Sequence, residues 1–364
     1  MKRLAALLCI SFFFCLFCQA QKTVVFQMDT VYNQEKISLP FKDIIVADAR
    51  FDQTKLGGIY NKMILGMLTT TKRDVVFPDS LKNYLPYIIK SFSTLSDTSS
   101  KNLYILVKKF RVAENFMTSI QGTLNNYFTL NISASFYAIQ NDQYKKLFSI
   151  EDVFLHDIDI ESDVKLSLQY NKNQRASILK NILYKLMAYK DWNNEPKGPL
   201  FSTVDVETAI QKRFMLPVYT QQAVTGLYKT FLEFKNASPS VTSAIIIYKN
   251  GKVQNVVDQN HYEIRLNDYW GLSDGTKNYL IFRNELTELI PCGKSFRLLS
   301  YRTKDELSGR ATVKEVSSKD FFTTLFGEGK VREYFDLDMD TGEIFMEEIF
   351  GKSSFKNIDN KRLK

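Results

Sequence analysis

The amino-acid sequence predicts an α+β fold, in which an N-terminal antiparallel sheet carries two helices on one face and a mostly β C-terminal domain follows. Two segments of the first half have apolar residues at intervals of three and four, the period of an amphipathic helix. Other segments of the first half alternate apolar and polar residues, as half-buried strands do. Most of the second half consists of strand-like runs separated by glycine turns. This segregation of helices from an antiparallel sheet is typical of the α+β class.

The two predicted helices are identified by their apolar stripes. The first covers 78–95 and begins with Pro78 and Asp79, residue types that favour a helix start. Its stripe consists of Leu81, Leu85, Ile88, Ile89 and Phe92. The second is expected over about 174–189. Its stripe consists of Ile178, Ile182, Leu183, Leu186 and Met187. Both stripes are expected to pack on one face of the sheet.

The predicted strands of the first half cover 43–49, 103–112, 127–139 and 145–155. The last two are separated by the sequence Gln-Asn-Asp-Gln at 140–143, which predicts a tight antiparallel hairpin. The order of elements is therefore strand, helix, three strands and helix.

A short motif ends the first strand. Asp48 and Arg50 flank Ala49, and the loop after them closes at Gly57. A strand ending in Asp-x-Arg before a glycine-closed loop, followed by this order of elements, resembles small envelope lipoproteins of the YajG type and the auxiliary lipoproteins of ABC transporters. The resemblance covers less than half of the chain and implies that Asp48, Arg50 and Gly57 form a structural motif. The lipid-attachment cysteine of those families has no match here.

The domain boundary is predicted near Pro196, because residues 193–199 (Asn-Asn-Glu-Pro-Lys-Gly-Pro) interrupt all periodicity. The predicted domains are an α+β domain over 21–195, a mostly β domain over 196–350 and a basic tail over 351–364. Within the second domain, short helices are expected over 204–214 and 226–235. Turns are expected at Asn250-Gly251, Asp274-Gly275, Gly293 and Thr341-Gly342.

Two phrases of the second domain carry a further resemblance. They are Gly226-Leu-Tyr-Lys-Thr-Phe, which leads to Asn236-x-x-Pro-Ser, and Trp270-Gly-x-x-Asp-Gly. Both resemble phrases in a group of uncharacterised exported proteins of Bacteroidota. The resemblance implies export and a shared architecture, and no particular activity.

An export signal is expected over 1–20. Lys2 and Arg3 precede an uncharged run of 15 residues from Leu4 to Cys18, and small residues follow at the expected cleavage site before Gln21. The run is shorter than the roughly 20 residues that span a bilayer, and no later segment is longer, so no transmembrane span is expected. The sequence therefore predicts a mature protein in the periplasm or outside the cell.

The cysteines and the net charge bear on which anchors, cross-links and partners are expected. Because Cys9, Cys15 and Cys18 lie in the signal and none follows a small residue, neither a lipid anchor nor an internal disulfide is expected. Cys292 is expected to be buried or in a turn rather than to act as a nucleophile. The net charge of +8 falls to +6 without Lys2 and Arg3, which is mild, and an exported chain is not expected to bind nucleic acid. The tail 351–364 is expected to be solvated, with weak contact to an anionic surface as the alternative.

One string resembles a catalytic motif. Residues 271–275, Gly-Leu-Ser-Asp-Gly, match the nucleophile elbow G-x-S-x-G. The elbow requires a helix after the serine and a later histidine, whereas a strand is expected over 278–282 and both histidines, His156 and His261, come earlier. A hairpin turn is therefore favoured. With two histidines and one mature cysteine, and without a phosphate-binding glycine motif, no metal or cofactor is expected.

Two acidic runs invite a calcium interpretation. Residues 156–163 place carboxylates at alternate positions, for which a solvent-facing strand edge is the favoured interpretation. Residues 336–343 begin like a calcium loop, but Thr341 occupies the position that requires glycine. A hairpin with Gly342 in the left-handed region is favoured there.

The candidate contact residues are Tyr262, Asp268, Tyr269 and Trp270. Their aromatic rings are suited to stacking on a sugar or anchoring a protein, although core packing is favoured for Trp270. The leading hypothesis is a non-enzymatic envelope protein, an interaction or assembly accessory whose partner is another envelope protein. The alternatives are a carbohydrate- or small-ligand-binding module and, third, a hydrolase with an unrecognised carboxylate pair.

Overall fold

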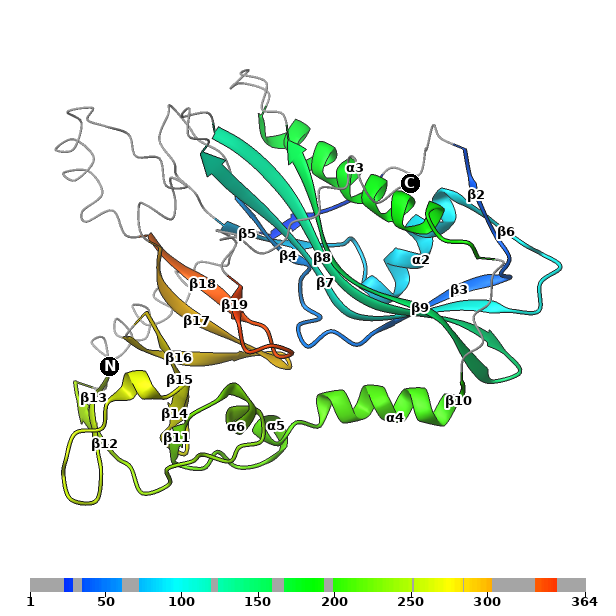
Figure 1. Cartoon of the computed structure of the whole chain (residues 1–364). Helices are drawn as coiled ribbons and strands as arrows, with labels where there is room; N and C mark the ends of the chain where they lie inside the picture. Colours follow the sequence, from blue (N-terminus) through cyan, green and yellow to red (C-terminus); the bar gives the residue numbers. More distant parts are fainter. Residues whose placement is uncertain are drawn as a thin grey trace, which may run out of the picture.

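The computed structural model describes most of the chain, and two sheets form its framework (Figure 1). The described residues are 23–28, 35–60, 72–118, 124–158, 167–192, 199–250, 252–283, 285–302 and 331–345. The expected signal 1–20, the expected linker up to residue 198, the acidic positions 159–163 and the tail 351–364 lie outside them.

The first sheet has the order β1-β5-β4-β7-β8-β9-β10, and β3 also pairs with β7. Its strands are β1 (Thr23–Val25), β3 (Asp43–Asp48), β4 (Gly57–Tyr60), β5 (Lys72–Val76), β7 (Asn102–Thr118), β8 (Leu124–Gln140), β9 (Gln143–Ile158) and β10 (Leu200–Ser202). A separate parallel pair consists of β2 (Ile37–Leu39) and β6 (Ser93–Leu95). The turn between β8 and β9 has positive φ at both Asn141 and Asp142, the geometry of a two-residue hairpin loop, as the sequence predicted.

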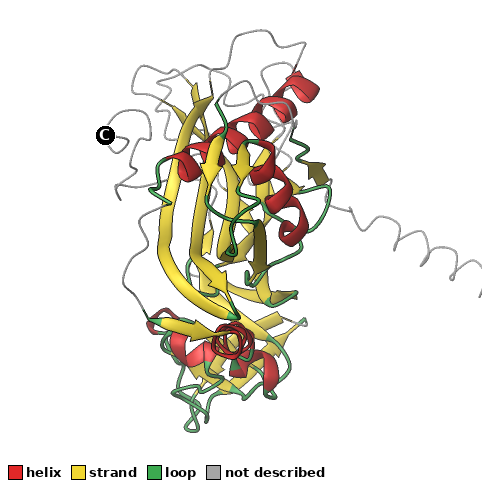
Figure 2. Ribbon diagram, turned by 90° about the vertical axis from the view of Figure 1, so that its right-hand side faces the viewer, coloured by secondary structure: helices red, strands yellow, loops and turns green. Residues whose placement is uncertain are grey.

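The predicted helices both pack on one face of this sheet (Figure 2). They are α2 (Leu81–Ser91) and α3 (Ser167–Ala188), and the residues of their stripes are buried or partly buried in the largest apolar core. The first helix ends earlier than predicted, because Ser93–Leu95 forms β6 and pairs with β2. The α+β class is confirmed. The sheet is mixed rather than wholly antiparallel, since β3 and β4 both run parallel to β7 after the chain crosses the sheet through α2.

The opposite face of the first sheet is covered by α4 (Thr203–Phe214). Leu103 and Ile105 of β7 face the α2–α3 core, whereas Tyr104 and Leu106 lie in a second apolar cluster with Val206 of α4. This alternation places the two clusters on opposite faces. Because β10 pairs with β9, the first sheet continues past the boundary predicted at residue 195, and the second sheet begins only at Gly226.

The second sheet is antiparallel throughout, which agrees with the predicted mostly β character. Its strands are β11 (Gly226–Tyr228), β14 (Gly271–Ser273), β15 (Asn278–Phe282), β16 (Glu285–Cys292), β17 (Ser295–Arg302), β18 (Val331–Leu337) and β19 (Ile344–Phe345). A separate hairpin is formed by β12 (Ile245–Lys249) and β13 (Lys252–Val257). The short helical elements are α5 (Pro217–Thr220), α6 (Phe231–Lys235) and η1 (Leu266–Asp268). The helix predicted over 226–235 is therefore divided into β11 and α6.

The two sheets are joined by side chains that cross between their cores. Phe51, from the loop after β3, packs in the core of the second sheet and meets Phe214 of α4 edge to face, with ring centroids 6.0 Å apart. The Arg213 guanidinium lies 4.2 Å from the centroid of the Phe51 ring. Among the described helices, none has the length and apolarity that crossing a bilayer requires.

Candidate functional site

The Asp-x-Arg motif shapes the loop that links β3 to β4. The Arg50 side chain folds back on Asp48, with Nε 2.8 Å from Oδ1 and Nη2 2.7 Å from Oδ2. Its Nη1 donates to the Lys55 carbonyl at 2.7 Å, which bridges the loop. At the end of the loop, Gly57 has a φ of +138°, and it pairs with Val112 of β7. The motif therefore holds the loop 49–56 in one conformation at the junction of the two sheets.

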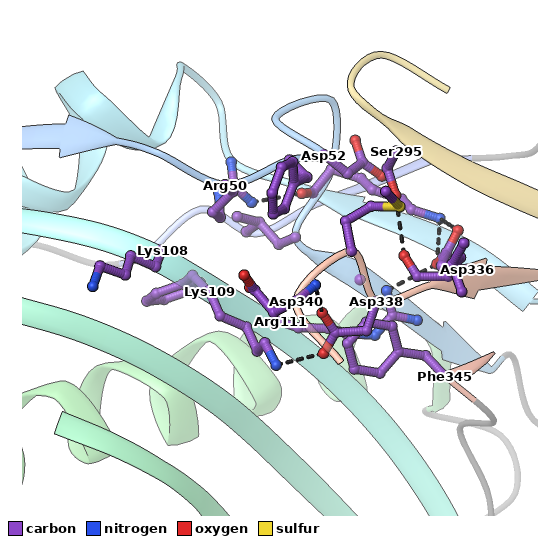
Figure 3. A pocket seen from close by; sticks show the side chains of 17 residues that line it. Arg50, Asp52, Lys108, Lys109, Arg111, Ser295, Asp336, Asp338, Asp340 and Phe345 are labelled. Carbon is purple, nitrogen blue, oxygen red and sulfur yellow. Dashed lines mark hydrogen bonds and ion pairs between the residues drawn. The ribbon is translucent and has the colours of Figure 1, made fainter. Parts of the chain in front are cut away.

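Cations of the first sheet, Lys109 and Arg111 among them, meet aspartates at the end of the second sheet (Figure 3). Lys55 Nζ lies 2.8 Å from the Asp336 carboxylate and 3.3 Å from Asp74. Arg111 Nη1 donates to Asp336 at 2.8 Å. The second sheet contributes one cation as well, since Arg297 Nε lies 3.4 Å from Asp336.

The same arrangement continues along the β18–β19 hairpin. Lys109 Nζ donates to Asp338 at 2.5 Å, and Arg213 donates to both oxygens of Asp340 at 2.6 and 2.7 Å. We call this cluster the charged joint. It consists of Lys55, Lys109, Arg111, Arg213, Arg297, Asp74, Asp336, Asp338 and Asp340.

Three of the four aspartates of the joint, Asp336, Asp338 and Asp340, come from the acidic run that resembles a calcium loop. The structure forms the predicted hairpin, with Gly342 at a φ of +80° and its N–H bonded to the Asp338 carbonyl at 2.7 Å. Asp336 and Asp338 are almost completely buried, and their carboxylates accept hydrogen bonds from lysine and arginine. A carboxylate neutralised by cations in this way is a poor ligand for a further cation.

A cavity of about 70 Å³ lies within the charged joint. This volume holds roughly two water molecules at ~30 Å³ each, whereas pockets for small molecules occupy roughly 300–1,000 Å³. Phe345 forms part of the wall, and the Arg111 guanidinium lies 4.3 Å from its ring centroid. The joint can therefore hold two sheets together, and its cavity is smaller than the usual pocket for a small molecule.

The four candidate contact residues do not form one surface. Tyr262 is 72% exposed, in the loop after β13. The Trp270 ring packs against Phe231 and Phe234 of α6, with centroids 5.4 and 4.8 Å apart, in the core of the second sheet. Tyr269 packs against the adjoining apolar cluster, and Asp268 is exposed at the end of η1. Of the four, Tyr262 presents the most accessible ring.

The string G-x-S-x-G forms the predicted hairpin, between β14 and β15. Ser273 is completely buried, and its Oγ accepts from the Gly275 N–H at 3.1 Å. Of the two residues of the predicted turn, Gly275 has a positive φ and Asp274 does not. Asp274 instead accepts hydrogen bonds from Lys277 N–H at 2.6 Å and Tyr248 Oη at 2.5 Å. Burial raises the pKa of the Asp274 carboxyl, but these bonds outweigh burial and hold that pKa well below its usual range.

The remaining nucleophile and metal candidates are dispersed. Burial raises the pKa of the half-buried Cys292 thiol, and the negative charge of Asp52 adds to this, so the reactive thiolate is disfavoured. His156 lies on β9 of the first sheet, and His261 is exposed in the loop after β13. Across the described residues, no three His, Cys, Asp or Glu side chains are arranged to hold a metal ion.

Sequence reasoning did not identify the cations of the joint. Lys109 and Arg111 gave one usable signal, since residues two apart on a strand lie on the same face. No sequence signal marked Lys55, Arg213 or Arg297, because isolated cations are common on protein surfaces.

No family model and no curated protein matches the chain. Among solved structures, the crystal structure of protein XCC0632 from Xanthomonas campestris, of the DUF330 family, is similar at 10% identity and a TM-score of 0.25. The match covers 46% of this chain and 93% of that one. The resemblance to YajG-type lipoproteins stays a prediction.

Proposed function

We propose that this chain is an exported, non-enzymatic accessory protein of the cell envelope that binds another envelope protein. The supporting observation is the charged joint. Its buried aspartates are each engaged by the chain's own lysine or arginine side chains, and its cavity of about 70 Å³ leaves no room for a substrate. The charged joint therefore fixes two sheets together, and the exterior remains for binding.

The exterior around the second sheet offers contacts for a protein. Met215, Leu232 and Tyr262 are 67, 64 and 72% exposed, respectively. Large apolar side chains of this kind provide binding energy when a partner removes them from water. An enzymatic role for the joint would instead require a carboxylate free to exchange a proton with a substrate.

Photo-crosslinking in native cells tests this proposal. A benzophenone amino acid is introduced at Tyr262, and at the exposed Tyr189, which follows α3, as a control. We expect a discrete adduct with one envelope protein from position 262 and none from position 189. Recovery of the chain only as an unpartnered monomer, or in the cytosol with residues 1–20 still attached, would overturn the proposal.

A second candidate function, binding of a carbohydrate, is favoured by one cavity near the start of α2. The cavity has a volume of about 380 Å³, within the range of ligand pockets, and is lined by Gln27, Met28, Pro78, Asp79, Asn83, Tyr84 and Tyr87. The rings of Tyr84 and Tyr87 lie 5.7 Å apart at 31°, and Tyr87 is 50% exposed. The Tyr84 hydroxyl accepts from Met28 N–H at 2.8 Å, which fixes its ring.

Replacing Tyr87 by alanine tests the carbohydrate hypothesis. We expect a glycan array with the wild-type chain to identify a ligand whose affinity falls up to about tenfold in Tyr87→Ala, because one stacking ring contributes ~0.5–1.5 kcal/mol. Tyr189→Ala, which removes an equally exposed ring, is expected to bind normally. A wild-type chain that binds no glycan would rule out this second function and leave the first untouched.

A further inference from the structure

The outer edge of β12 is an open strand edge. β12 pairs with β13 on one side, and no other described strand pairs with it. Its residues are Ile245, Ile246, Ile247, Tyr248 and Lys249. Ile245 and Ile247 are 42 and 40% exposed on one face of the hairpin. An exposed apolar edge without proline is a template for pairing with another strand.

The edge strand β12 is held in place by contacts with the second sheet and its turns. Ile246 packs in an apolar cluster with Leu227 and Leu272, and the Tyr248 hydroxyl donates to Asp274 at 2.5 Å. The irregularity in the hairpin leaves Gln254 of β13 without an opposite residue, so β12 itself is regular. Because the strand is already ordered, pairing costs little conformational entropy.

We propose that β12 pairs with β12 of a second copy of this chain, antiparallel about a two-fold axis through Ile247. Ile247 is the midpoint of the strand, so this register pairs all five residues. Ile247 then faces its own counterpart, and Ile246 faces Tyr248. Lys249 faces Ile245, so its aliphatic stem covers the isoleucine while the two ammonium groups lie at opposite ends.

The arrangement of charge supports a second copy as the occupant. Lys249 carries the strand's only charge, and in the proposed register it never faces a like charge. The net charge of the mature chain, +6 without Lys2 and Arg3, opposes association over a distance, but salt screens such repulsion beyond ~8 Å at physiological ionic strength. The β12–β13 hairpin also lies at the periphery of the structure, beside the second sheet and away from the first, so that two copies can approach (Figure 1).

The expected product is a weak dimer, because pairing of two five-residue strands buries less than the roughly 1,200 Å² typical of stable complexes. Sedimentation velocity on the mature chain should show a reversible monomer–dimer equilibrium between micromolar and millimolar concentrations. Ile247→Lys places two like charges face to face on the axis and is expected to leave only monomer. Ile290→Lys, at another exposed isoleucine on β16, is expected to dimerise as the wild type does.

Cysteine crosslinking tests the register. Opposite residues of an antiparallel pair have Cα atoms ~4.5–5.5 Å apart, within the range that a disulfide spans. In a Cys292→Ser background, Ile247→Cys is therefore expected to crosslink with its own counterpart under mild oxidation. Ile245→Cys is expected to stay reduced, because two Ile245 positions lie about four residues, or ~13 Å, apart along the paired strands.

The inference does not depend on the proposed envelope partner. A wild-type chain that stays monomeric at millimolar concentration would overturn it, as would a dimer that Ile247→Lys leaves intact. Equal crosslinking at positions 245 and 247 would overturn the two-fold register. None of these outcomes changes the expectation for photo-crosslinking at Tyr262, so failure of either proposal is recognised separately.

Discussion

Replacing Asp336 by asparagine is expected to lower the free energy of unfolding by about 3–5 kcal/mol, as is usual when one partner of a buried ion pair is removed. Asp336 is 5% exposed and lies within ion-pair distance of Lys55, Arg111 and Arg297. Asparagine keeps the shape but removes the charge, so three cations remain around a neutral amide. Urea denaturation at neutral pH, followed by tryptophan fluorescence, measures the change in midpoint.

The neighbouring Asp340 provides a matched control on the same hairpin. Its side chain is 32% exposed, and among the described residues its ion-pair partner is Arg213. Because solvent screens such a pair, Asp340→Asn is expected to cost about 1 kcal/mol or less. If the two asparagine variants lost the same stability, the buried part of the joint would be no more important than its rim, and the account of the joint would be wrong.

The joint is better understood as a determinant of orientation than as a source of stability. Desolvating charged groups costs several kcal/mol per ion, and the pairing offsets this only when the geometry is good. Asp336, Asp338 and Asp340 alternate along one strand and the turn after it, and each engages a different cation. A slip of the hairpin by one residue would turn these carboxylates to the other face. The ion pairs therefore select one position of the second sheet on the first.

The elements of the first sheet were predictable because their signals are local. The stripe from Leu81 to Phe92 and the alternation from 127 to 139 each occur within one segment, and the structure confirms both. The parallel pairing of β3 with β7 was not predicted, since it depends on a crossover that contains several elements. The early end of α2 depends on the distant partner of β6, which the stripe cannot reveal.

The candidate site was less predictable for the same reason. Lys55 is 281 residues from Asp336, and Arg213 is 127 residues from Asp340. No spacing rule connects residues so far apart, so the acidic run suggested a metal loop or a plain hairpin. Trp270 is different, because core packing is the usual place for its large ring and the structure places it against Phe231 and Phe234. The Asp-x-Arg motif was visible because its members lie within ten residues of one another.

Replacing Gly57 by alanine is the second substitution with a large expected effect, about 3 kcal/mol or more. A Cβ atom at this position would lie 1.9 Å from the Val112 carbonyl oxygen, and the φ of +138° is one that alanine rarely adopts. The backbone strain alone costs ~1–3 kcal/mol.

The obstructing atom cannot move aside easily. Val112 belongs to the central strand β7, and its N–H donates to the Leu56 carbonyl at 2.7 Å. Relief of the clash would therefore separate β4 from β7 and loosen the loop that carries Lys55 into the charged joint.

Gly293→Ala is the control, because its φ of +61° carries a similar preference but its nearest neighbour, the Phe51 carbonyl oxygen, is 3.9 Å away. Its expected cost is ~1–2 kcal/mol, the intrinsic cost of the left-handed region. Urea denaturation of both variants separates steric overlap from conformational preference, and equal losses would show that the contact with Val112 contributes nothing.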